Sequence, residues 1–300
     1  MKKFCDIITS IKTKGFEATA LDIFNFQAQE CAPYREYLEL LGVDIQSIDS
    51  IAKIPFLPIE LFRSHRVYCG TGDAELEFAS SGTTGTDTSV HYVASAQLYR
   101  DSFMSGFREF FGSPQDFRLV TMLPCYREGS SLLYMIEELK RQCTGQRVIL
   151  WGVTFALLEA ARSTEDVRLA EGSIVLETGG MKGRGREIER TALHAELTEA
   201  FGVESIYSEY GMCELLSQGY SRGEGLFQPS STMRVVGRSL HNPLSEEEVG
   251  RVSGLNIIDL ANLYSCSFIA TGDRGIVYPD GSFEVLGRIE GEVLRGCNML

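Results

Sequence analysis

The hydrophobic and polar positions predict helices at the start of the chain. Apolar residues recur every three or four positions over 20–29 and again over 34–41, which is the spacing of a helix that buries one face. Gly42 follows the second stretch and is a suitable residue to end a helix. Two prolines within 54–62 then favour an extended segment, because proline is poorly tolerated inside a helix.

From residue 75 to about 215, short apolar runs alternate with amphipathic stretches. The apolar runs predict strands at 75–79, 117–123, 147–150, 173–176 and 204–207. The amphipathic stretches predict helices at 95–111, 130–142, 155–162 and 186–201. This alternation is typical of parallel strands joined by helical crossovers, so active residues are expected at the carboxyl ends of the strands.

After about residue 220 the helical pattern fades. Short apolar runs, separated by Gly, Pro, Asn and Asp, predict strands at 233–236, 251–258, 267–270, 275–278 and 283–286. The sequence therefore predicts an α/β protein in three parts. These are a helical N-terminal region at 1–74, an α/β core at 75–219, and a β-rich subdomain with a short tail at 220–300.

The charge balance excludes some partners. The chain has 300 residues, with 28 Lys and Arg against 41 Asp and Glu, a formal net charge of −13. This charge repels a phosphate backbone, so we expect no binding to nucleic acid. No apolar run approaches the roughly 20 residues that cross a bilayer, so no integral membrane segment is expected.

The cysteine pattern favours the cytoplasm. The eight cysteines include no C-x-x-C pair, which argues against a zinc knuckle or a thioredoxin-like motif. No apolar segment follows the basic residues at the N-terminus, so no secretory signal is visible. We expect a cytoplasmic protein with reduced, buried thiols. The four histidines show no ligand spacing and are expected to be structural.

The loop at 80–86 has the composition of a phosphate cradle. It reads Ser-Ser-Gly-Thr-Thr-Gly-Thr and follows an expected strand. Its glycines allow backbone N–H groups to turn toward an anion, and its hydroxyls add donors. The lysine of a Walker A loop is absent. Taken alone, the stretch is equally well explained as a solvated Ser/Thr/Gly loop.

Two later stretches follow expected strands. Within 207–214, Tyr210 could stack on a purine and Glu214 could hold Mg²⁺ through oxygen, although an ordinary helix N-terminus is the simpler interpretation. The stretch 177–186 combines three cations with several glycines and could attract a polyphosphate. An exposed loop that offsets the acidic surface is the alternative.

The β-rich part contains two more candidates. Asp273, in an expected turn at 271–274, could accept both hydroxyls of a ribose, although Gly and Asp are also the usual residues of a plain turn. Arg288, within 287–291, could reach a phosphate or a ribose with its planar fork of donors. A surface arginine is the ordinary alternative.

The order of these motifs resembles the adenylate-forming superfamily of acyl-CoA synthetases, luciferases and peptide-synthetase adenylation domains. Ser-Gly-Thr-Thr-Gly, Tyr-Gly-Met-x-Glu, Thr-Gly-Asp and Gly-Arg follow one another within 80–291. Stretches at 33–38, 54–62, 178–183 and 209–218 resemble the LuxE-type acyl-protein synthetases, and phenylacetate-CoA ligases are next nearest. The resemblance covers nearly the whole chain. It implies a large core of mostly parallel sheets flanked by helices, with a small β-rich subdomain.

The resemblance implies an ATP-dependent, AMP-forming ligase that uses Mg²⁺. In that superfamily a carboxylic acid attacks the α-phosphate of ATP, which gives an acyl-adenylate and pyrophosphate. The phosphates would lie on Ser80, Ser81, Gly82, Thr83, Thr84 and Gly85. The other nucleotide-binding residues would be Gly179, Gly180, Tyr210, Gly211, Asp273 and Arg288. Glu214 would hold the metal, and the catalytic residues would be Glu214, Lys182 and Cys297.

The sequence departs from the family pattern in two places. Cys213 stands where the motif usually has threonine, and a thiol is a weaker hydrogen-bond partner, so adenylation could be slowed. The sequence ends at Leu300, without the mobile C-terminal domain of about 100 residues that is usual in the family. We therefore expect that domain, its lysine and its surfaces for coenzyme A to be missing.

A cysteine near the C-terminus offers another acyl acceptor. Cys297 resembles the acceptor cysteine of LuxE-type proteins, and the neighbouring Arg295 would favour its thiolate. We expect Cys297 to take a fatty acyl group from the adenylate as a thioester and to pass it to a reductase partner. A surface thiol without function is the ordinary alternative. An acid–CoA ligase of the phenylacetate type and a catalytically degenerate nucleotide-binding subunit also stay open.

Overall fold

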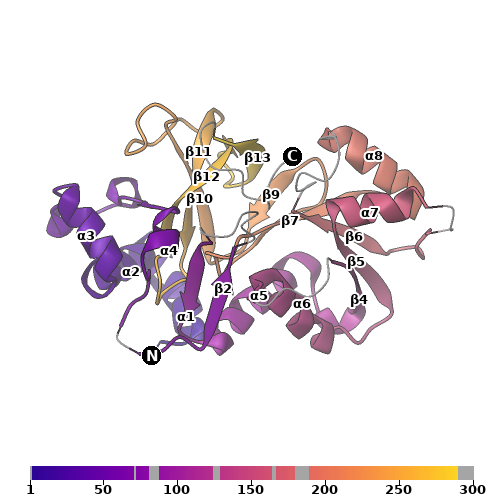
Figure 1. The fold of residues 1–300 in the computed structure, drawn as a ribbon, viewed down its shortest axis with the longest axis horizontal. Helices are drawn as coiled ribbons and strands as arrows, with labels where there is room; N and C mark the ends of the chain where they lie inside the picture. The colour runs from indigo at the N-terminus through magenta and orange to yellow at the C-terminus, as the bar shows by residue number, and fades with distance from the viewer. Residues whose placement is uncertain are drawn as a thin grey trace.

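The computed structural model describes residues 2–70, 72–80, 88–123, 129–163, 167–179 and 189–289. Figure 1 shows their arrangement. The helices are α1 (Phe4–Lys14), α2 (Phe16–Glu30), α3 (Ala32–Leu40), α4 (Leu61–Ser64), α5 (Ala96–Phe111), α6 (Ser131–Gln142), α7 (Thr154–Ala161) and α8 (Arg190–Phe201). The strands are β1 (Leu57–Pro58), β2 (Leu76–Ala79), β3 (Val90–Val93), β4 (Phe117–Met122), β5 (Arg147–Val153), β6 (Ile174–Thr178), β7 (Ile206–Tyr210), β8 (Gly219–Ser221), β9 (Leu226–Pro229), β10 (Met233–Arg238), β11 (Val252–Asp259), β12 (Phe268–Val277) and β13 (Phe283–Arg288).

The helices expected at the start of the chain are confirmed as α2 and α3. Gly42 lies two residues after the last residue of α3 and adopts a φ of +67°. There the N–H of Gly42 donates to the carbonyl of Glu39 and the N–H of Val43 to that of Leu38, both at 3.0 Å. These two bonds satisfy carbonyls that the helix end would leave unpaired. The proline-containing segment after the helices is extended and pairs as β1 with β12.

The helices expected in the alternating region are confirmed as α5 to α8. The hydroxyl of Ser95 accepts from the N–H of Leu98 at the start of α5, and Ser130 accepts from Leu133 at the start of α6. Helix α8 ends at Gly202, with a φ of +66°. The expected helix began at residue 186, but 186–188 lie outside the described residues.

Within the described residues, eleven strands form one sheet in the order β10-β11-β12-β13-β9-β8-β7-β6-β5-β4, with β1 beside β12. Strands β4 to β7 run parallel, as expected. Successive residues of a strand face opposite sides. Leu150 and Val175 therefore share a core with α7 and α8, whereas Ile149 and Leu176 join the core that contains α5 and α6. Figure 1 shows these helix pairs on the two sides of the parallel strands.

The structure corrects two sequence expectations. The strand at 75–79 is not part of the parallel series, because β2 pairs antiparallel with β3 in a separate hairpin. The strands expected at 267–270 and 275–278 are one continuous strand, β12. Thr271–Arg274 is therefore not a turn: Asp273 and Arg274 pair with β13, Arg274 also pairs with β11, and the β11 register shifts opposite 271–273. The tertiary pairing overrides the turn preference of Gly and Asp.

The mixed α/β class expected from the sequence is confirmed. The sheet continues across residue 219, because β8 lies between β7 and β9. The division into three regions stays a prediction. In the described part of the chain, we find no helix with the length and apolar character that crossing a membrane requires.

Candidate functional site

Three of the sequence motifs meet at one buried aspartate. The hydroxyl of Tyr210, at the end of β7, donates to Oδ2 of Asp273 at 2.8 Å. Arg288 Nη1, at the end of β13, donates to Oδ1 of the same carboxylate at 2.6 Å. Asp273 and Arg288 are also direct partners in the β12–β13 ladder. The fold thus assembles residues that lie 63 and 15 positions from Asp273 along the chain.

The Tyr210 ring is enclosed. It is 1% exposed and lies edge-on to the rings of Phe227 and Phe283, with centroids 5.9 and 5.2 Å away. Burial, together with the neighbouring Asp273, raises the pKa of Tyr210 well above its usual value. The tyrosine therefore stays protonated and orients the carboxylate as a hydrogen-bond donor. The stacking of Tyr210 on a purine stays a prediction.

The loop after β7 is held by a second buried aspartate. Asp259 Oδ2 accepts from the N–H groups of Leu216 and Ser217, at 2.7 and 3.0 Å. Its Oδ1 accepts from the Ser217 hydroxyl at 2.6 Å and from the N–H of Ala261 at 3.1 Å. Charge-assisted bonds of this kind are stronger than neutral ones, so they fix the backbone that carries Glu214.

A buried histidine supports the same loop from the other side. The two ring nitrogens of His91 lie 2.7 Å from the carbonyl oxygen of Cys213 and 2.9 Å from Oδ1 of Asn262. Asn262 Nδ2 donates to the carbonyl of Glu214 at 2.8 Å. Burial lowers the pKa of His91 to about 4, although its hydrogen bonds with Cys213 and Asn262 act in the opposite direction. The structural role expected for this histidine is confirmed.

Glu214 is a suitable magnesium ligand. Its side chain is almost fully buried, and burial raises its pKa even though hydrogen bonds with Cys213 and Ser89 act in the opposite direction. A cation would compensate the cost of that buried charge. No group of three or more His, Cys, Asp or Glu side chains that could hold a metal occurs among the described residues. Mg²⁺ commonly uses only one or two carboxylates together with water and phosphate, so a single glutamate fits it.

Sequence reasoning missed a buried carboxylate beside the motif. Glu209 lies one residue before Tyr210, on the opposite face of β7, and accepts from the Thr178 hydroxyl at 2.5 Å. Burial, together with the nearby Glu177, raises the pKa of Glu209 to about 7. A Cβ on Gly211 would lie 2.4 Å from Glu209 Oε1, so any other residue here would displace that carboxylate. The strand expected from the sequence ended at residue 207, so the pattern gave no signal that Glu209 would be buried.

Two unpartnered polar atoms belong to residues beside Glu209. Tyr220 is its direct partner on β8, and Gln218 lies opposite Gly211 on the same sheet face. Among the described residues, Gln218 Oε1 and the Tyr220 hydroxyl have no hydrogen-bond partner, although both are buried. Buried polar atoms usually have partners. This face of β7 and β8 is therefore suited to a group that supplies hydrogen bonds.

The remaining predicted residues divide between described and undescribed segments. Ser80 follows β2, and its hydroxyl accepts from the N–H of Ser89 at 3.0 Å. Gly179 follows β6 and has a φ of +78°. The others lie outside the described residues, and their roles stay predictions: Ser81, Gly82, Thr83, Thr84, Gly85, Gly180, Lys182 and Cys297.

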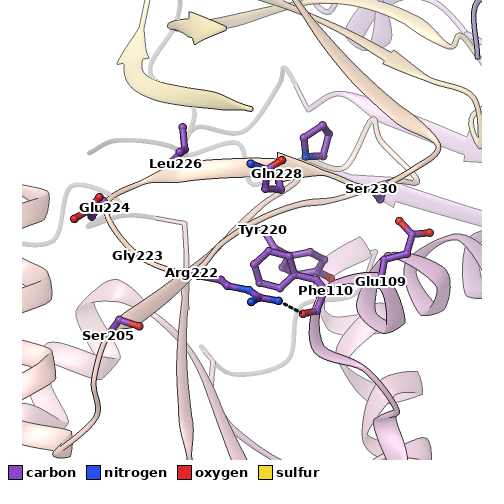
Figure 2. A pocket seen from close by; sticks show the side chains of 12 residues that line it. Glu109, Phe110, Ser205, Tyr220, Arg222, Gly223, Glu224, Leu226, Gln228 and Ser230 are labelled. Carbon is purple, nitrogen blue, oxygen red and sulfur yellow. Dashed lines mark hydrogen bonds between the residues drawn. The ribbon is translucent and has the colours of Figure 1, made fainter. Parts of the chain in front are cut away.

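A pocket of about 660 Å³ lies between the C-terminal half of α5 and the strands β8 and β9. Figure 2 shows Arg222 beside Phe110, to whose carbonyl its Nη2 donates at 3.0 Å. The guanidinium also lies over the Phe110 ring, 5.0 Å from its centroid. None of the residues that line the pocket was a sequence candidate.

Comparison with known proteins supports the fold. The chain matches no protein-family model and no curated protein sequence. Among solved structures, an open conformation of 2-hydroxyisobutyryl-CoA ligase in complex with 2-HIB-AMP and CoA matches with a TM-score of 0.71 and 12% identity, over 94% of this chain and 76% of that one. ATP-bound MatB from Rhodopseudomonas palustris matches with a TM-score of 0.54 and 16% identity, over 73% and 49%. MenE, the O-succinylbenzoate coenzyme A synthetase of Bacillus subtilis in complex with ATP and magnesium, gives 0.53 and 18%, over 73% and 52%.

The similarity to these three solved structures is a similarity of fold. The chain spans about half the length of MatB and of MenE. At 12 to 18% identity, the similarity is one of fold rather than of sequence. The chain therefore has the fold shared by parts of these acyl-CoA ligases.

Proposed function

We propose that this chain is an ATP-dependent, AMP-forming ligase that activates a carboxylic acid as its acyl-adenylate. The observation that carries the proposal is the contact of Tyr210 and Arg288 with Asp273, which unites three motifs whose order resembles the adenylate-forming superfamily. The solved structures of the same fold add support, since one holds ATP and magnesium and another an acyl-AMP.

The residues suit the handling of a nucleotide. Tyr210 and Arg288 orient the carboxylate of Asp273, which would accept from the ribose hydroxyls as the family resemblance implies. Glu214 would hold Mg²⁺, which neutralises phosphate charge when bound. Ser80–Gly85 would contact the phosphates and Lys182 would add a positive charge. The acid's carboxylate then attacks the α-phosphorus and pyrophosphate leaves, a reaction that depends mainly on positioning and charge neutralisation.

The acceptor in this proposal is Cys297. Its thiolate would attack the acyl carbonyl, forming a C–S bond while the bond to AMP breaks. The thioester would then pass to a reductase partner in the cytoplasm, as in LuxE-type proteins that act on fatty acids. Coenzyme A is the alternative acceptor, and the solved CoA ligases of the same fold favour testing it.

Acid-dependent exchange of pyrophosphate into ATP tests activation. We expect exchange with at least one acid from a panel of fatty and aromatic acids, and its loss in Asp273→Asn. Asp49→Asn is a matched control, because this aspartate is exposed and pairs with Lys53 on the surface. Absence of exchange with every acid would favour a degenerate nucleotide-binding subunit.

Intact mass spectrometry tests the acceptor. After incubation with ATP and the active acid, we expect one acyl group on the protein and none on Cys297→Ser. Equal acylation of the variant would exclude Cys297. AMP release that requires coenzyme A, without acylation of the protein, would instead support the ligase alternative.

A further inference from the structure

Three cysteines meet where the N-terminal helices contact the sheet. Cys31 joins α2 to α3, Cys69 follows α4, and Cys266 lies in the turn before β12. All three are free and buried, with exposures of 0, 5 and 0%. None of them takes part in the proposed function. Their proximity is visible only in the fold, because no two of them are neighbours in the sequence.

Cys31 and Cys69 have the spacing of a disulfide. They are direct partners in an isolated antiparallel β-bridge. The Cα atoms of such partners lie about 4.5 to 5.5 Å apart, and their side chains leave on the same side. A disulfide needs Cα atoms about 4.4 to 6.8 Å apart, so the bond could form without a large backbone movement.

The two thiols are chemically unequal. Cys31 is the N-cap residue of α3, and its pKa is lowered, chiefly by a hydrogen bond with the Cys69 thiol and further by the N–H groups of Tyr34 and Tyr68. The same bond, together with burial, raises the pKa of Cys69 far above its usual value. Of the two thiols, Cys31 is therefore the more acidic. A thiolate beside a second thiol is the arrangement that disulfide formation requires.

Cys266 is the less reactive member. It is fully buried, and burial raises its pKa well above the usual value. Its thiol donates to the carbonyl of Phe268 at 3.4 Å. This thiol is therefore not expected to provide the attacking sulfur.

We propose that Cys31 and Cys69 are a redox-active dithiol that a hydroperoxide converts into a disulfide. The Cys31 thiolate attacks the peroxide, which gives a sulfenic acid and releases water once a proton is taken up. Cys69 then attacks the Cys31 sulfur, the S–S bond forms and a second water leaves. In sum, two thiols and one hydrogen peroxide give one disulfide and two waters, and a thiol reductant reverses the change. Since both sulfurs are buried, local opening precedes the reaction.

The disulfide between Cys31 and Cys69 would change contacts near the candidate site. The Cys69 N–H donates to the carbonyl of Tyr264 at 2.8 Å, and its thiol donates to that of Ser265 at 3.2 Å. These residues belong to the turn whose Asn262 holds the backbone of Glu214. Oxidation removes the Cys69 proton and with it the bond to Ser265. Oxidation of the pair would therefore remove one contact of the turn that supports Glu214, the proposed metal ligand.

Peptide mapping under non-reducing conditions tests the proposal. The full chain is treated with hydrogen peroxide, alkylated and digested, and we expect a peptide that links Cys31 to Cys69 with the loss of two hydrogens. Dithiothreitol should restore both thiols. Exposed Cys5 is an internal comparison, because it should become oxidised without entering this link.

Two variants sharpen the result. In Cys69→Ser, dimedone should trap a sulfenic acid on Cys31, whereas Cys266→Ser should leave the link intact. Circular dichroism establishes that each variant is folded. If a variant does not fold, the peptide map of the wild-type protein still tests the proposal. Two free thiols at 31 and 69 after peroxide has oxidised Cys5, or a link from Cys31 to any other cysteine, would overturn the proposal.

Discussion

Replacing the buried Glu209 with glutamine should stabilise the protein in mild alkali. Burial raises the pKa of this carboxyl from 4.5 to about 7, so the folded state holds the proton more tightly than the unfolded state. The free energy of unfolding of the wild type therefore falls as pH rises from about 4.5 to 7, and the loss is complete above 7. The difference between about 7 and 4.5, at about 1.4 kcal/mol per pKa unit, corresponds to roughly 3 kcal/mol.

Glu209→Gln removes the charge and keeps the acceptor for the Thr178 hydroxyl. Relative to wild type, we expect a gain of up to roughly 3 kcal/mol at pH 8 and little change at pH 4.5. Urea unfolding can be followed by the fluorescence of Trp151, the single tryptophan, which is fully buried in β5. Glu199→Gln is the control, because that residue is exposed on α8. An equal effect of Glu209→Gln at both pH values would refute the reasoning.

Three further outcomes follow from the same contacts. Gly211→Ala places a Cβ against the Glu209 carboxylate, so we expect a loss of about 1–3 kcal/mol in urea unfolding; an unchanged midpoint would contradict the close approach. His91 has its pKa lowered from 6.5 to about 4, so its part of the stability is present above 6.5 and is lost as pH falls toward 4. Between pH 6.5 and about 4, the free energy of unfolding should therefore fall by roughly 3 kcal/mol less in His91→Gln than in wild type, compared at matched pH. Arg288→Met leaves Asp273 buried without its cation and should cost about 3–5 kcal/mol, of which the double variant with Asp273→Asn should recover a part; simple additivity in the double-mutant cycle would show that the pair is not coupled.

Helices and their ends were predictable because their signals are local. Ser95 and Ser130 cap the helices that follow them, and Gly42 and Gly202 end helices with positive φ. Each of these features depends on residues within one turn of the chain. The parallel part of the sheet was also predictable, since strand and helix patterns alternate there.

Strand pairing was harder to predict because its partners are distant. Thr271–Arg274 has the composition of a turn, yet it lies inside β12 because Asp273 and Arg274 pair with β13 and Arg274 also pairs with β11. The hairpin of β2 and β3 was missed for a similar reason: a short apolar run does not specify whether its partner runs parallel or antiparallel.

By itself, the sequence determined the helices, the parallel strands and the order of the motifs along the chain, because these follow from local preferences and spacing. Only the tertiary structure decided which side chains meet. It placed Asp273 between Tyr210 and Arg288, buried Glu209 beside Thr178, and brought Cys31 opposite Cys69. Burial and long-range pairing arise only when the chain is packed, and they set the charges, donors and reactivities of these groups.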